Sequence, residues 1–469
     1  MHPDAESSPA PAPPPPEDGP AALAERDDLR NGVDTILPWG KTLLLGLQHV
    51  LAMYVGAVTV PLLVGTALGL ARADVAALIS ADLFTCGLAT LLQTLGLGPR
   101  VGVRLPVMLG VSFVAVGPMI SIGKQLGLPY VYGAIICSGL AMALLAPLLG
   151  GLRRFFPPLV TGTLVTLIGA SLAPVAIGWA AGGHGAPDFG APRHLALAGL
   201  VLSIITLLTA RGRGFVRSIA VLIGLLAGAA VAFALGGFGD ATAAVRAEPW
   251  LQAVTPLRFG TPRLEPAAVL TMGLVALVCA VESMGIFYAV GRLVGREPDE
   301  RRLAAGLRAE GLAIALGGAL NSFPYTTFSQ NAGLVALTAV RSRFVVAAAG
   351  AILVALGCLP KLAAVFAVLP RGVLGGAGIA LFGMVTASGI SVLRRAELDR
   401  SQSQFVVAVA LGGGLGVAHL PQALGQLPGA LRLLFGDGIV LGTLLAVGLN
   451  ALLNPSRKAE PQASPPSGS

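Results

Sequence analysis

The sequence predicts an all-α polytopic membrane protein whose fourteen transmembrane spans form a seven-plus-seven inverted repeat. Only 12% of the 469 residues are charged, against about 25% in a typical soluble domain. Hydrophobic residues make up 55% of the chain, and the mean hydropathy is +0.80. These values exclude a soluble enzyme, a disordered regulator and a coiled coil. The net charge of +8 is spread in small groups between apolar runs, so no nucleic-acid partner is expected.

Apolar segments between two polar tails set the predicted spans. A helix needs about 20 residues to cross a hydrocarbon core of about 30 Å, and several segments are shorter or interrupted by Gly and Pro. The expected limits, in chain order, are 42–64, 75–97, 105–123, 130–151, 157–178, 195–210, 218–238, 267–291, 304–320, 323–340, 344–368, 373–393, 404–418 and 435–453. Residues 1–36, rich in Pro, and residues 455–469 cannot build a core, so we expect disordered tails.

The distribution of basic residues sets the expected orientation. With a cytoplasmic N-terminus, the inside loops hold 17 of the 31 Lys and Arg residues, the outside loops hold nine, and the segments before the first span and after the last hold five. This bias follows the positive-inside rule. We therefore expect a multi-pass protein of the cell membrane with both termini in the cytoplasm.

The third and tenth spans have an unusual composition. They correspond under a repeat of seven spans, and the odd number of spans per repeat inverts the second half. Each opens with a proline, Pro106 or Pro324, continues with residues that favour extended backbone, and then turns helical. Each break is therefore expected to be a short strand leading into a half-helix. Two half-helix N-termini would face each other and offer free backbone N–H groups to a ligand.

Acidic side chains deep in apolar spans are the first candidates for chemistry. Glu282 lies in the middle of span 8, where an ionised carboxylate is costly unless it is paired, hydrated or protonated. It could respond to a proton, or merely bond a neighbouring helix. Glu310, near the start of span 9, is either functional or a helix-start carboxylate favoured by the dipole. Asp82 in span 2 either links helices or contacts the ligand. His49 in span 1 either ties two helices together or takes part in proton coupling.

Gln330 and Asn331 lie at the break of span 10. A glutamine amide offers a donor and an acceptor, which matches an N–H/C=O edge of a planar base. Phe113, at the matching break of span 3, could stack on such a ring or simply pack. Motifs for a phosphate-binding loop, a zinc protease or a serine hydrolase are missing, and the four cysteines form no C-x-x-C pair. We expect no catalytic residue, no metal and no cofactor, with an ion gradient as the energy source.

Four motifs in order resemble the nucleobase–ascorbate transporter family, most of all its bacterial xanthine and uric acid permeases. They are QHVLAMY at 48–54, ESMG at 282–285, FPYTTFSQN at 323–331 and QNAGLVALT at 330–338. The last is similar to the family signature Gln/Glu/Pro-Asn-x-Gly-x4-Thr-Arg/Lys/Gly. The likeness runs from about Leu37 to Asn454, nearly everything but the tails.

The resemblance implies a division into a core domain and a gate domain. The core would consist of spans 1–4 (residues 37–152) and spans 8–11 (residues 266–370). The gate would consist of spans 5–7 (residues 153–265) and spans 12–14 (residues 371–454), and would form the contact of a homodimer. The family also implies symport of a nucleobase with protons; sodium is the alternative coupling ion.

The resemblance further implies roles for individual residues. Glu282 and Gln330 would hydrogen-bond the base, while Phe113 would stack on it. The set is completed by backbone groups at Phe113, Phe328 and Ser329, close packing at Gly56, support of the break by Asn331, a coupling role for Glu310, and an orienting role for His49.

Two positions depart from the family's patterns. Ala339 stands where the signature has Arg, Lys or Gly, and Ile286 stands where some xanthine carriers have Asp. Both weaken any inference about which purine is preferred.

The sequence thus predicts a proton-coupled symporter that imports a purine, most of all xanthine or uric acid, by elevator-type alternating access. Gln330 favours these purines, because uracil carriers of the family more often have Glu there. Alternatives are a symporter of uracil or another nucleobase, a sulfate-type anion carrier on the same fold, and a passive channel or receptor. An anion carrier should place a positive group at the half-helix ends and no buried glutamate, so Glu282 argues against it.

Overall fold

The computed structural model describes residues 32–150, 155–238 and 241–454. The expected C-terminal tail lies outside the described residues, as do residues 1–31 of the N-terminal tail and the expected domain boundary at 152–153.

Apolar helices make up most of the described chain, and Pro or Gly commonly lies at their ends. The elements are α2 (Trp39–Ala67), α3 (Arg72–Leu95), η1 (Gly98–Arg100), β1 (Leu109–Val111), η2 (Phe113–Ala115), α4 (Val116–Gln125), α5 (Leu128–Leu149), α6 (Pro158–Ala180), α7 (Pro192–Arg211), α8 (Phe215–Ser218), α9 (Ala220–Ala234), α10 (Ala241–Ala247), α11 (Pro266–Leu293), α12 (Glu300–Ala319), β2 (Tyr325–Thr327), α13 (Ser329–Thr338), α14 (Arg343–Gly357), α15 (Pro360–Ala367), α16 (Arg371–Leu393), α17 (Ser401–His419), η4 (Pro421–Leu424), α18 (Gly429–Phe435) and α19 (Gly438–Leu453). The predicted all-α membrane fold is confirmed.

Eight of the described helices are long and apolar enough to cross a membrane, and up to ten if each bent pair counts as one span. The number of fourteen spans therefore stays a prediction. The segment expected at 344–368 as one span is bent by 79° between α14 and α15. Pro360 begins α15 there and has no N–H to continue the helix from Gly357. A second bend, of 75°, separates α18 from α19.

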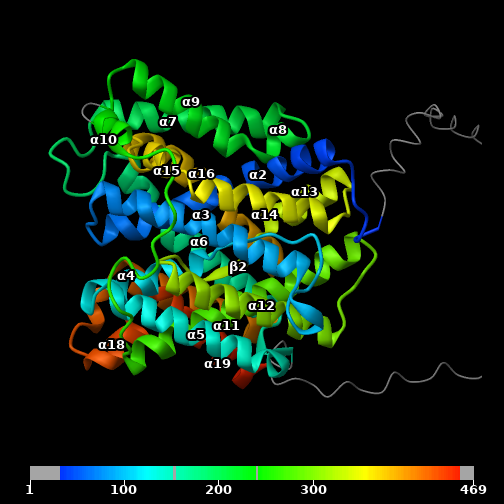
Figure 1. Ribbon diagram of the computed structural model, residues 1–469. Helices are drawn as coiled ribbons and strands as arrows, with labels where there is room; N and C mark the ends of the chain where they lie inside the picture. The colour runs from blue at the N-terminus through cyan, green and yellow to red at the C-terminus, as the bar shows by residue number, and fades with distance from the viewer. Residues whose placement is uncertain (1–31, 151–154, 239–240, 455–469) are drawn as a thin grey trace, which may run out of the picture.

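The short strands expected at the breaks of spans 3 and 10 are present and pair with each other. β1 and β2 run antiparallel, with Leu109 opposite Thr327 and Val111 opposite Tyr325. Both strands are fully buried, and β2 lies in the middle of the helices (Figure 1). Each strand leads within two to five residues into a helix of ten residues, α4 or α13. Because strand pairing satisfies the extended backbone, the break is stable at this depth.

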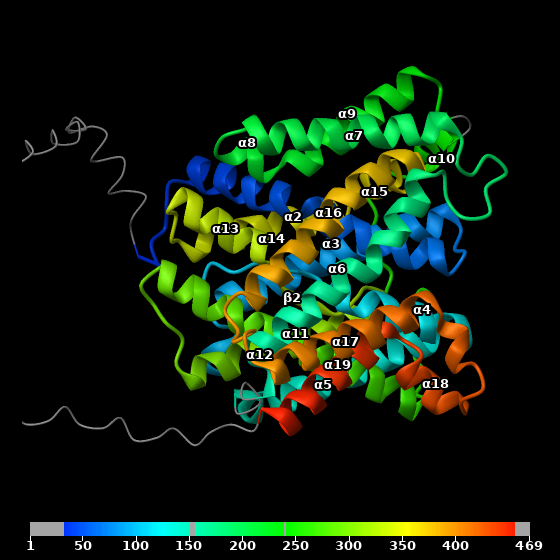
Figure 2. The ribbon, with the colours of Figure 1, turned by 180° about the vertical axis from the view of Figure 1, so that it is seen from behind.

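Helix packing repeats with a period of seven predicted spans. The pair α3–α14, spans 2 and 11, corresponds to the pair α12–α5, spans 9 and 4, and both pairs are present. The same relation holds between α2–α14 and α11–α5, between α7–α9 and α17–α19, and between α7–α16 and α17–α6. Figure 2 shows α6 beside α16 and α17 beside α19. The contacts therefore follow the inverted repeat that the composition of spans 3 and 10 predicted.

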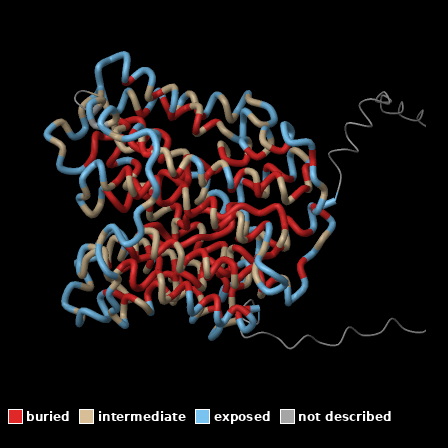
Figure 3. Tube along the Cα trace, viewed as in Figure 1, coloured by how far each residue is buried: buried red, intermediate tan, exposed pale blue. Residues whose placement is uncertain are grey.

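Burial is concentrated around the strands and decreases towards the outer helices (Figure 3). The most apolar stretches of α7 and α17 are only 17% and 22% buried inside the protein. Apolar helices that face outward suit a lipid environment, where they lose no hydrophobic stabilisation.

Candidate functional site

The candidate site lies where α11 packs against β2 and α13. Glu282 is near the middle of α11 and half-buried, and its Oε2 accepts a hydrogen bond of 3.3 Å from Thr326 Oγ1. The neighbouring Ser283 Oγ accepts the backbone N–H of Thr327 at 2.9 Å. Two successive side chains of α11, Glu282 and Ser283, therefore both hydrogen-bond β2, the strand that leads into α13.

The N-terminus of α13 is open. Its N-cap residue, Phe328, makes no side-chain hydrogen bond to the first turn. Ser329 and Gln330 begin the helix and are exposed. The unpaired N–H groups of a first turn attract anions and carbonyl oxygens. This end therefore combines backbone donors with the amide of Gln330.

Asn331 anchors α13 to the first long helix. Its Nδ2 lies 3.1 Å from His49 Nδ1, 3.1 Å from the His49 carbonyl oxygen and 3.2 Å from Met108 Sδ. Because Nδ2 donates, the Nδ1 atom of His49 accepts, which leaves the ring proton on Nε2. His49 and Asn331 are both buried and face each other rather than the exposed surface of α13.

The Phe328 ring packs tightly between the break of span 10 and two glycines, one on α2 and one on β1. Its ring is 5% exposed and packs on Gly56 of α2, where an added Cβ would come within 2.8 Å of the ring. Gly110 of β1 lies against the same ring. The backbone N–H of Phe328 donates to the Met108 carbonyl oxygen at 2.9 Å, so it serves the strand pair in this conformation.

Phe113 lies at the corresponding break of the first repeat. It begins η2 directly after β1, is half-buried, and makes an edge-to-face contact with Phe382 of α16 at 5.9 Å between ring centroids. The ring therefore lies between the strand pair and the helix α16.

Glu310 is fully buried in α12. Neither of its carboxyl oxygens makes a hydrogen bond of normal geometry to the described residues, although it interacts with the Ser283 hydroxyl. Glu282 also lies close enough to interact with it. Ser283 thus connects Glu310 to the Thr327 backbone, and the two acidic residues share one polar cluster.

The cavity that touches Glu282 is small. It measures about 10 Å³ and is lined by Phe156, Thr161, Leu164 and Val165 of the α6 region together with Val278, Val281 and Glu282 of α11. This is room for about one water molecule. A planar base would need α6 and α11 to separate here.

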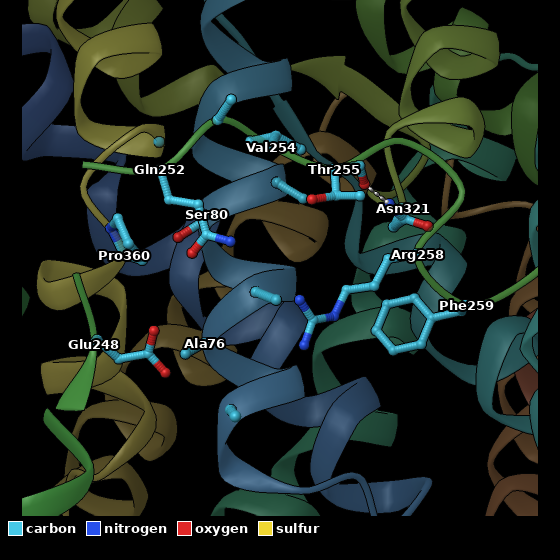
Figure 4. A pocket seen from close by; sticks show the side chains of 15 residues that line it. Ala76, Ser80, Glu248, Gln252, Val254, Thr255, Arg258, Phe259, Asn321 and Pro360 are labelled. Atoms are coloured by element: carbon cyan, nitrogen blue, oxygen red, sulfur yellow. Dashed lines mark hydrogen bonds between the residues drawn. The ribbon is translucent and has the colours of Figure 1, made fainter. Parts of the chain in front are cut away.

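A larger pocket, of about 70 Å³, lies elsewhere (Figure 4). It is formed by α3 and the loop after α10; Gln252 and Arg258 reach over α3, and Asn321 Nδ2 donates to the Thr255 carbonyl oxygen at 2.7 Å. None of the predicted site residues lines it.

The structure brings Glu282, Gln330, Phe113, Ser329 and Glu310 to the region of the two breaks, with His49, Asn331, Gly56 and Phe328 packed behind it. Asp82 lies apart, in a hydrogen-bonded cluster of its own. Thr326, Ser283 and Met108 also contribute to the site and were not predicted from the sequence. Thr326 and Ser283 are polar residues inside apolar segments and were visible as such; Met108 had no signal. Within the described residues, no group of three His, Cys, Asp or Glu side chains could hold a metal ion.

Comparison with known proteins shows the family of the chain. A family model described as a permease family matches residues 40–423. The chain is 47% identical to the xanthine permease of Bacillus subtilis over 92% of this chain and 97% of that protein. It is 45% identical to the uric acid transporter UacT of Escherichia coli over 90% of this chain and 88% of that protein.

Among solved structures, the chain resembles the transmembrane domain of a cyanobacterium bicarbonate transporter, BicA. The TM-score is 0.53 at 14% identity, covering 89% of this chain and 99% of that chain. The murine Solute Carrier 26 family member A9 anion transporter, in the inward-facing state, gives a TM-score of 0.56 at 14% identity, covering 88% and 68%. These likenesses show the fold. The family model and the relatives at 45–47% identity establish that this chain is a transporter, not an enzyme, and that it belongs to the nucleobase–ascorbate transporter family of permeases.

Proposed function

We propose that this chain is a proton-coupled symporter that imports a purine nucleobase, with xanthine or uric acid as substrate. The carrying observation is the open N-terminus of α13, where the exposed Gln330 follows the strand that binds Glu282 through Thr326. The relatives named above, a xanthine permease and a uric acid transporter, support the substrate class.

The chemistry of the site suits such a base. A purine-dione presents N–H and C=O groups side by side on its edge. The amide of Gln330 can pair with one such edge, and the Glu282 carboxylate can accept a second N–H. Free N–H groups at the start of α13 would bind a carbonyl oxygen, and Phe113 would cover a ring face.

An anion carrier on the same fold is less well supported. Such a site would need a basic side chain at the half-helix ends, and residues 105–118 and 323–338 contain no Lys or Arg. Glu282 adds a negative charge there instead.

Alternating access is proposed as movement of the core against the gate. The core domain is residues 37–152 and 266–370, and the gate domain is residues 153–265 and 371–454. Support comes from the position of the site between α11 and α6, where the cavity holds about one water molecule. We further propose a homodimer formed by the gate, a location in the cell membrane and cytoplasmic termini.

The coupling proton is proposed to enter the cluster of Glu282 and Glu310. Two acidic side chains that interact in an apolar interior cannot both be ionised cheaply. A proton shared by the two carboxyl groups would allow the site to bind a neutral base. Release of that proton would favour release of the base. Accumulation of substrate should therefore collapse when a protonophore removes the gradient.

Uptake of radiolabelled xanthine by proteoliposomes with an imposed pH gradient tests the proposal. Loss of the Gln330 side chain in Gln330→Ala should leave substrate groups unpaired, at about 1–3 kcal/mol. This corresponds to roughly a 5- to 150-fold loss of transport efficiency. Glu282→Gln should abolish uphill uptake, and the exposed Gln422→Ala should behave as wild type. Wild-type uptake in both site variants would overturn the assignment.

A further inference from the structure

Asp82 is a fully buried carboxyl that the proposed site does not use. It lies on α3 with 0% exposure. Its Oδ1 accepts hydrogen bonds from Ser322 Oγ at 3.0 Å and from Tyr325 OH at 3.1 Å, and these two hydroxyls lie 2.6 Å apart. The Cys86 thiol faces Oδ2 at 3.6 Å. We call these four side chains the Asp82 clamp.

No cation balances this carboxyl within the described part of the chain. The titratable groups that face it are Cys86 from its own helix and Tyr325 from β2. The elements packed against α3, namely α2, α12, α14, α15 and β1, bring no charged group into contact with it among the described residues. An ionised form therefore rests on neutral donors alone, which makes its charge sensitive to their arrangement.

The inverted repeat relates Asp82 to Glu310. Helices α3 and α12 occupy spans 2 and 9, and each acid is the eleventh residue of its helix. Both are fully buried. The fold therefore places one interior carboxyl on each of the two related helices, and only Glu310 belongs to the polar cluster of the candidate site.

The Asp82 clamp acts on the strand that leads into the candidate site. Ser322 lies three residues before Tyr325, the first residue of β2, and the next residue, Thr326, binds Glu282. The Thr327 N–H then binds Ser283. Tyr325, Thr326 and Thr327 are consecutive residues of β2. A movement of Tyr325 in the clamp would therefore also move the hydroxyl that binds Glu282.

Ionised and protonated Asp82 hold this strand differently. The carboxylate accepts both hydroxyls on Oδ1. A proton on Oδ1 would compete with those two donors, whereas a proton on Oδ2 would face the Cys86 sulfur, a weak acceptor. Either position weakens the clamp.

The larger pocket is lined by two sequence neighbours of the clamp. They are Ser80, two residues before Asp82, and Asn321, one residue before Ser322. Both are buried, and Ser80 Oγ and Asn321 Oδ1 have no hydrogen-bond partner among the described residues. The pocket has room for about five water molecules.

We propose that Asp82 is a second proton-binding site, separate from Glu282 and Glu310, and that its proton loosens the hold of Ser322 and Tyr325 on β2. Its effect on transport rests on the proposed function, but the binding of the proton does not. Asp82 acts on the substrate through Tyr325 and Thr326, so it is a positioning residue.

Infrared difference spectra of the purified protein, recorded through a pH titration without substrate, test the proton site. Wild type should show a protonated-carboxyl band that Asp82→Asn removes and the exposed Asp399→Asn retains. Tyr325→Phe keeps the carboxyl and removes one donor, so it should shift the band even if Asp82→Asn fails to fold. Identical bands in wild type and Asp82→Asn, or no shift in Tyr325→Phe, would overturn the proposal.

Xanthine binding measured against pH tests the link to transport. In Asp82→Asn the change of Kd between acidic and alkaline pH should be at least twofold smaller than in wild type. Glu310→Gln should leave the Asp82 band in place. A protein that shows this band but binds no purine would refute the proposed function alone. Purine binding with the same pH profile in wild type and Asp82→Asn would refute the link.

Discussion

The anchor between Asn331 and His49 gives a prediction that can be worked out from distances. The Asn331 amide nitrogen carries two hydrogens and faces three acceptors at 3.1–3.2 Å, so it makes two full hydrogen bonds. Each buried hydrogen bond contributes about 0.5–1.5 kcal/mol net. Asn331→Ala should therefore reduce the free energy of unfolding by about 1–3 kcal/mol.

A double-mutant cycle separates the two bonds. The bond to the His49 carbonyl survives in His49→Ala, whereas the bond to the ring is lost. The coupling energy between Asn331→Ala and His49→Ala should therefore equal one hydrogen bond, about 0.5–1.5 kcal/mol. Reversible unfolding in mixed detergent micelles measures it. The exposed Gln422→Ala is the control and should change stability by no more than about 0.5 kcal/mol.

Asn331→Ala should also change transport, by raising the KM for xanthine. Asn331 lies one residue after Gln330, so loss of its anchor frees the start of α13 to move. Xanthine KM should rise while the amount of protein in the membrane stays the same. A coupling energy below about 0.3 kcal/mol, or an unchanged KM with a stability loss no larger than that of the control, would refute the anchoring role.

Two further predictions concern packing and pH. Gly56→Ala should impair uptake, because the new Cβ would come within 2.8 Å of the Phe328 ring, whereas Gly40→Ala at the open start of α2 should not; equal uptake in both variants would contradict the steric argument. Asp34 forms ion pairs with Arg343 at 2.6 Å and Arg296 at 2.7 Å. Partial burial acts to raise the pKa of Asp34, but hydrogen bonds from both arginines outweigh it and hold the pKa below its usual value. Because the folded-state pKa is the lower one, the stabilisation is present above the unfolded pKa and is lost as pH falls. Melting curves should show Asp34→Asn less stable than wild type at pH 7, with the difference shrinking as pH falls below 3.8; a constant difference would contradict the assignment.

Local chemistry explains which parts of the fold could be predicted. Pro106 and Pro324, each followed by residues that favour extended backbone, predicted two strands, and β1 and β2 confirm them. The bend at Pro360 was not predicted, because the continuous apolar run suggested one span. Pro360 was nevertheless a signal for it, because proline breaks a helix. The Asp82 clamp was not predictable. It joins residues 240 and 243 positions apart in the chain, and only the packing of α3 against the entry to β2 brings them together.

The strand-to-helix breaks of spans 3 and 10 differ in how the N–H groups after the strand are satisfied. At the first break, Ser112 caps η2, the short turn that precedes α4, by accepting the N–H of Val114 at 3.3 Å, so the N–H groups that directly follow β1 are partly satisfied. At the second break Phe328 supplies no such cap, and the first turn of α13 stays open beside Gln330. We therefore expect a polar ligand to gain most of its hydrogen bonds from the second repeat. The first repeat would contribute the Phe113 ring and the rigid partner strand. Recognition at this symmetric pair of breaks would then be asymmetric, and a side chain that caps α13 should weaken substrate binding even where it touches no substrate atom.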